Sequence, residues 1–87
     1  MADGKKISRE LEIKLESWNN LNSWACNIED AIQALLKEQH RDYTWAIMSL
    51  VSEHANICGQ RAIELHEMRP LGVEDSEAAL ALAAKTF

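Results

Sequence analysis

Three side chains in the middle of the sequence, Cys26, His54 and Cys58, are of types that bind metals. His54 and Cys58 are four residues apart, which would place both on one face of a helix. With Cys26 they would offer three ligands that suit zinc, but there is no CxxC or HxxxH spacing and no obvious fourth ligand. Buried cysteines commonly act as small apolar groups, and a histidine at a core edge needs only a hydrogen bond, so we predict no metal site.

The same residues could pair a cysteine nucleophile with a histidine base. Such a site also needs an oxyanion hole and a pocket. A narrow helix pair has no pocket, and the three glycines are scattered rather than gathered in a loop. A disulfide between the two cysteines is disfavoured too, because they fall about 7.5 Å out of step along the expected helices. We therefore predict no catalytic residues and no cofactor.

Composition sets the class of protein. The chain has 87 residues, with nine Lys and Arg against fourteen Asp and Glu and a net charge of −5. This balance opposes a general nucleic-acid binder held by phosphate contacts. Apolar residues make up 47% of the chain, too many for a disordered protein. No apolar run is long enough to span a membrane, and no signal peptide follows Met1. We expect a single helical domain over residues 1–87, located in the cytoplasm.

The elements that would position these residues are two long helices. Over residues 8–37 the apolar positions repeat at spacings of three and four, a pattern typical of a helix with one packed face: Trp18, Leu21, Ala25, Ile28, Ile32 and Leu35. Residues 42–69 carry a second apolar stripe in a different phase. The asparagines at 19, 20 and 22 leave open a kink or a break in the first helix.

Six consecutive polar residues, 37–42, separate the two stripes. A short polar turn between two amphipathic helices favours an antiparallel hairpin, so we place the turn at residues 38–41. Ser8 and Asp42 are the predicted N-caps of the two helices. If the hairpin pivots near residue 39 or 40, His54 faces Cys26, and Arg61 faces Trp18 in a cation–π contact.

Pro70 ends the second helix, and the alanine-rich residues 75–85 predict a short third helix that docks loosely or frays. This helix could fold back and cap the hairpin as a three-helix monomer. The alternative that we favour is association of two chains. The predicted fold class is all-α: a long antiparallel helical hairpin with a short C-terminal helix, pairing into a helical-bundle homodimer.

Large apolar side chains beside the stripes predict a surface that is covered in an assembly, because tryptophan is rarely left exposed to solvent. Small residues also line one side of the second helix, where another helix could approach closely. The turn adds polar and aromatic groups that could contact a partner. The candidate partner-binding residues are Trp24, Trp45, Arg41, Tyr43, Ser52, Ala55, Gly59 and Ala62.

From these features we interpret the chain as a small acidic non-enzymatic interaction protein, acting as an adaptor, a chaperone-like subunit or an inhibitor. Its expected partners are a second copy of itself and an unidentified protein, bound through helical faces. The alternative is an oligomeric protein that binds a small ligand or nucleotide in pockets between subunits. A third hypothesis is an enzyme or metal protein at Cys26, His54 and Cys58. We expect neither a membrane nor a nucleic acid as a partner.

Overall fold

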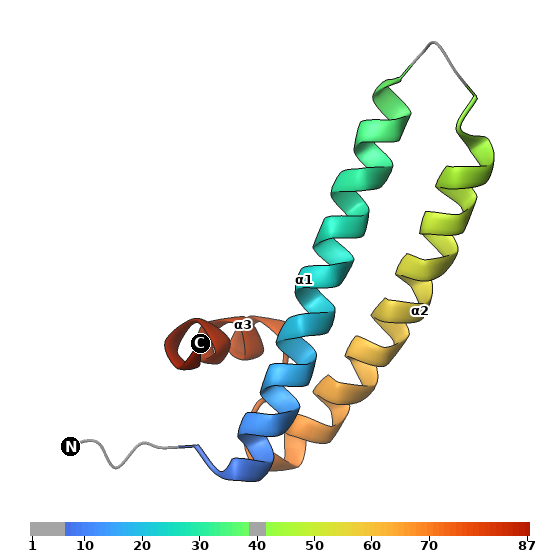
Figure 1. Ribbon diagram of the computed structural model, residues 1–87. Coiled ribbons are helices and arrows are strands. Elements are labelled where there is room, and N and C mark those ends of the chain that lie inside the picture. The colour runs from blue at the N-terminus through green and yellow to red at the C-terminus, as the bar shows by residue number, and fades with distance from the viewer. Residues whose placement is uncertain (1–6, 39–41) are drawn as a thin grey trace.

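A computed structural model describes residues 7–38 and 42–87, and all regular structure within them is helical. Two long antiparallel helices, α1 (Arg9–Lys37) and α2 (Thr44–Met68), lie side by side (Figure 1). The predicted hairpin is confirmed. The asparagines at 19, 20 and 22 do not interrupt α1, so the possible break into two helices is absent. Of the predicted turn, Glu38 caps α1 and the remainder lies outside the described residues.

The two N-terminal caps differ. Ser8 caps α1 as predicted, since its hydroxyl accepts a hydrogen bond from the backbone N–H of Leu11 at 3.1 Å. The prediction that Asp42 caps α2 is wrong, because the N-cap is Tyr43. The Asp42 carboxylate instead accepts the backbone N–H of Thr44, two residues on, at 2.9 Å, and also the Thr44 hydroxyl. This local turn lies just before the helix, and its hydrogen bonds lower the pKa of Asp42.

The chain reverses after α2 through a short 3-10 turn, η1 (Arg69–Leu71), which contains Pro70. Gly72 follows with φ of 104°, a left-handed conformation that glycine adopts without strain. The backbone N–H of Val73 then donates to the carbonyl of Met68 at 3.1 Å. This reversal sends the chain back toward α1.

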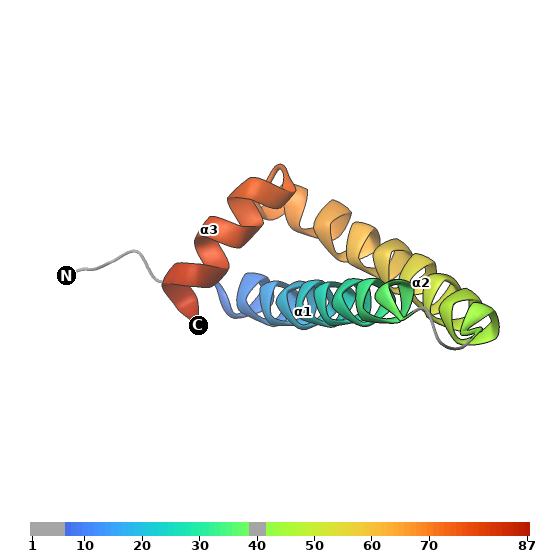
Figure 2. The same cartoon turned by 90° about the horizontal axis from the view of Figure 1, so that it is seen from above.

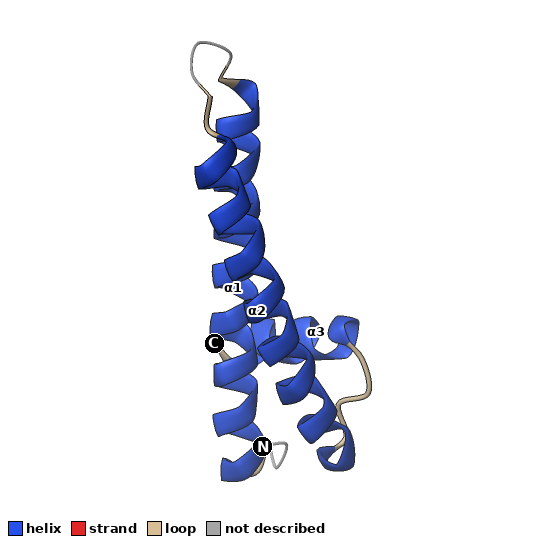
Figure 3. Ribbon diagram, turned by 90° about the vertical axis from the view of Figure 1, so that its right-hand side faces the viewer, coloured by secondary structure: helices blue, strands red, loops and turns tan. Residues whose placement is uncertain are grey.

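The third helix, α3 (Ser76–Thr86), lies across the open end of the hairpin (Figures 2 and 3). It is capped by Asp75, which accepts the N–H of Ala78 at 2.8 Å. Its buried residues, Ala79 and Ala83, join the larger of two apolar clusters, so α3 is docked rather than frayed. That cluster also contains Leu11, Leu15, Trp18, Met68 and Val73.

The second cluster is small, consisting of Ala25, Ile28 and Ile57. Beyond it, toward the turn, no described residue between 29 and 56 is buried. Leu36 and Trp45 in that region are exposed by 63% and 82%. Three-helix packing therefore occurs only at the open end, and the rest of the molecule is a two-helix pair. The radius of gyration, 16.4 Å, reflects this elongation, since a compact chain of this length would have about 12 Å.

We expect Leu15→Ala to lower the free energy of unfolding by about 2–5 kcal/mol, because Leu15 is completely buried in the larger cluster. The matched control is Leu36→Ala, which removes the same atoms from an exposed position and should cost less than about 0.5 kcal/mol. Urea denaturation followed by circular dichroism measures both changes. Equal losses in the two variants would contradict this account of the core.

Candidate interaction surface

A row of polar contacts joins the two long helices near their middle. His54 Nε2 lies 2.7 Å from Glu29 Oε2, and an Arg61 N–H donates to Asn22 Oδ1 at 2.7 Å. Cys58 lies between His54 and Arg61 on α2. Its sulfur is 3.6 Å from His54 Nδ1 and 3.6 Å from an Arg61 nitrogen. These contacts show which residues of α1 and α2 lie opposite each other.

The alignment differs from the predicted one by about one helical turn. Arg61 meets Asn22 rather than Trp18, and His54 meets Glu29 rather than Cys26. The cause is the position of the turn: α1 ends at Lys37 and α2 begins at Thr44, so the pivot lies later in the chain than residue 39 or 40. Trp18 packs into the larger cluster, and the predicted cation–π contact is replaced by the hydrogen bond to Asn22.

Cys26 lies exposed on α1, away from the His54–Cys58 pair, and both cysteines are free thiols. Across residues 7–38 and 42–87 there is no group of three or more His, Cys, Asp or Glu side chains that could hold a metal ion. The sulfur of Cys58 is nearly equidistant from the two ring nitrogens of His54, at 3.6 Å from Nδ1 and 3.7 Å from Nε2.

At the open end, two further polar contacts join α1 to α2. Lys14 Nζ donates to Glu67 Oε1 at 2.9 Å, and the Ser17 hydroxyl donates to Glu64 Oε2 at 2.8 Å. The hydrogen bond from Lys14 lowers the pKa of Glu67 below its usual value. Any stability from this interaction is therefore present above the usual pKa of a glutamate and is lost as the pH falls through the lowered value. Both groups are at the surface, so the contribution is small.

The side of α2 that faces away from α1 is uncharged over most of its length. Six exposed residues form what we call the outer stripe: Trp45, Met48, Ser52, Ala55, Gly59 and Ala62. Five of them are among the candidate partner-binding residues, and the structure brings these together on one face. A Cβ built at Gly59 would meet nothing within 4 Å, so the packing of the single chain does not require glycine there.

The other candidates lie elsewhere. Trp24 is on α1 and is exposed by 51%. It lies level with about residue 59 of α2, so it is about 20 Å from Trp45 along the helix axis. Tyr43 is half-buried at the start of α2. Arg41 lies outside the described residues. These eight positions therefore form one compact group on α2 with separate members on α1 and near the turn.

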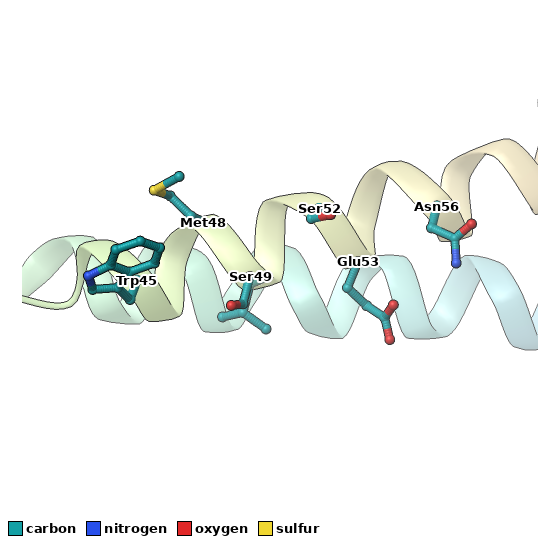
Figure 4. A pocket seen from close by; sticks show the side chains of 7 residues that line it. Trp45, Met48, Ser49, Ser52, Glu53 and Asn56 are labelled. Carbon is teal, nitrogen blue, oxygen red and sulfur yellow. The ribbon is translucent and has the colours of Figure 1, made fainter.

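Met48 was missed by the sequence reasoning, although it is exposed by 56% on the outer stripe. The signal that could have found it is the regular spacing of uncharged positions along α2. Met48 also lines an open groove beside Trp45, with Ser49, Leu50, Ser52, Glu53 and Asn56 (Figure 4). All of these residues come from α2, so the groove has a wall on one side only.

Neither a protein-family model, nor a curated protein, nor a solved structure matches this chain. In the part of the chain that the structure describes, no helix is both long enough and apolar enough to cross a membrane.

We expect His54→Leu to change the free energy of unfolding by less than about 1.5 kcal/mol, the scale of tolerated core substitutions. The reason is that Glu29, its partner, is half exposed and can bind water when the imidazole is removed. Thermal and urea denaturation measure the change. A much larger loss, or stoichiometric zinc in the purified protein that disappears on mutating His54 or Cys58, would contradict a purely structural histidine.

Proposed function

We propose that this chain is a non-enzymatic interaction protein that self-associates through its helical faces and binds a protein partner as an adaptor, a chaperone-like subunit or an inhibitor. The observation that carries the proposal is the amount of large apolar surface left exposed on so small a chain. The exposed large residues in the described ranges are Ile13, Trp24, Leu36, Trp45, Met48, Val51, Ile63, Leu80 and Phe87.

Exposed apolar side chains that lie next to one another distinguish an interaction site from ordinary surface, where such side chains are scattered. Trp45, Met48 and Val51 lie within two turns of α2, and each is more than half exposed. Tryptophan is among the residues that contribute most to binding at protein interfaces. This end of α2 is therefore a strong candidate for part of an interface.

Self-association into a four-helix assembly is supported by the two-helix packing toward the turn. Ile32, Leu35, Ile47 and Leu50 face the inside of the hairpin but stay half-buried. A second hairpin packed on α2 gives that helix a second neighbour and makes an assembly of four long helices. The small residues Ser52, Ala55 and Gly59 would let the backbone of another helix approach closely.

The alternative function, binding of a small ligand or nucleotide, rests on the groove beside Trp45. Ligand sites usually enclose most of the ligand surface. The groove is open and has Glu53 at its edge, so an anionic nucleotide would need a second subunit to close the site and to supply positive charge. A thermal-shift screen with nucleotides tests this alternative, and stabilisation by one of them would favour it over the interaction protein.

We expect sedimentation equilibrium at micromolar concentration to give about twice the chain mass. Dilution should return the mass of one chain, because reversible association follows mass action. Circular dichroism on the same samples checks that helix content persists in the diluted chain. A single-chain mass at every accessible concentration would contradict self-association and would leave the three-helix packing at the open end as the complete fold.

A further inference from the structure

The outer stripe repeats with the spacing of a helix-packing seam. Its positions, 45, 48, 52, 55, 59 and 62, are separated by three and four residues in alternation, and His66 continues the series. The inner stripe that contacts α1 has the same alternation, at 47, 50, 54, 57, 61, 64 and 68. Such spacing keeps a row of side chains facing one neighbouring helix. α2 therefore carries two such rows, which we call seams, on opposite sides of the helix. The inner seam packs against α1, and the outer seam is exposed.

We propose that the outer stripe of α2 packs antiparallel against the same stripe of a second copy, about a two-fold axis between Ala55 and Asn56. This inference rests on the proposed self-association and names the surface and the orientation. The resulting dimer is a row of four helices with the two α2 helices at its centre. Because the pairing is antiparallel, the two copies of α3 lie at opposite ends of the dimer along the helix axes.

The charge distribution favours a second copy as the occupant. A chain with a net charge of −5 repels its own copy, and a two-fold contact places identical groups near one another. The outer stripe from Trp45 to Ala62 holds no charged residue. A partner recruited by charge would instead be met by the acidic side chains that lie elsewhere on the hairpin. The outer stripe is thus a surface on which two acidic chains can meet without bringing like charges together.

The sizes of the side chains favour the antiparallel orientation. The bulky residues Trp45 and Met48 lie at one end of the stripe, and Gly59 and Ala62 lie toward the other. In a parallel pair, tryptophan would meet tryptophan and glycine would meet glycine, so the helices would splay at one end. In the antiparallel pair Met48 meets Ala62 and Ser52 meets Gly59, while Trp45 meets His66 at each end, so the two ends are equally wide and the helices do not splay at one end.

The area is sufficient for a specific contact. From Trp45 to His66 the stripe is about 31 Å long, nearly the full length of α2. Trp45, exposed by 82%, can bury on the order of 200 Å² by itself. Each partner of a standard interface covers about 600 Å² or more. Met48, Ile63 and the small residues along the remaining length supply the rest.

The test compares the same substitution at two serines one turn apart on α2. Ser52 lies in the outer stripe, and Ser49 lies about a quarter of the way around the helix from its centre. Both are exposed, so Ser52→Asp and Ser49→Asp add one charge to the surface of the single chain. In the dimer, Ser52→Asp buries that charge against Gly59 of the other copy, which leaves it without water or a partner.

Sedimentation equilibrium should show a dissociation constant at least about 30-fold larger for Ser52→Asp and changed by less than about threefold for Ser49→Asp. Circular dichroism should show equal helix content in both variants. A wild-type dimer that Ser52→Asp leaves intact, or that Ser49→Asp disrupts as strongly, would overturn the assignment of the seam while sparing self-association. A wild-type chain that is monomeric throughout would overturn the proposed self-association itself, and the seam with it.

Discussion

The limit that governs this molecule is that a helix in a hairpin has one neighbour and can bury one stripe of side chains. α3 relaxes this limit only at the open end, where Ala79 and Ala83 complete a cluster around Trp18. The indole N–H of Trp18 is buried there without a hydrogen-bond partner among the described residues. Toward the turn there is no third helix, and burial falls away beyond Ile28 and Ile57.

The polar residues on the inner stripe follow from the same limit. In a thicker core, an arginine and a histidine on the packed face would be buried without water. In a two-helix pair, Arg61 and His54 sit at the edge, where Asn22 and Glu29 pair with them and solvent covers the rest. These pairs link α2 to particular residues of α1 in the alignment that the position of the turn produces. His54, which could be a ligand or a base from its residue type alone, is thus paired with Glu29 across the hairpin.

The sequence was sufficient to predict the helices, because apolar periodicity and the polar segment at 37–42 are local signals. Ser8 was predicted correctly as a cap for the same reason. The facing pairs were not, because the pivot depends on where α2 begins, and the turn formed by Asp42 and Thr44 delays that start. The docking of α3 was left open, since alanines give a helix without saying what it packs against. Trp45 and the small residues of the outer stripe were candidates from the sequence, and the exposure of Met48 completes the stripe.

The most direct test of two seams on α2 is disulfide cross-linking in a chain whose native cysteines are replaced by serine. Ala55 adjoins the proposed two-fold axis, so Ala55→Cys should cross-link to its own copy under mild oxidation. Met48→Cys should not, because the two copies of residue 48 lie about 22 Å apart along antiparallel helices. Efficient cross-linking at both positions would show parallel helices, and none at Ala55→Cys would show that the outer stripe does not pair with itself. Either result would contradict the account.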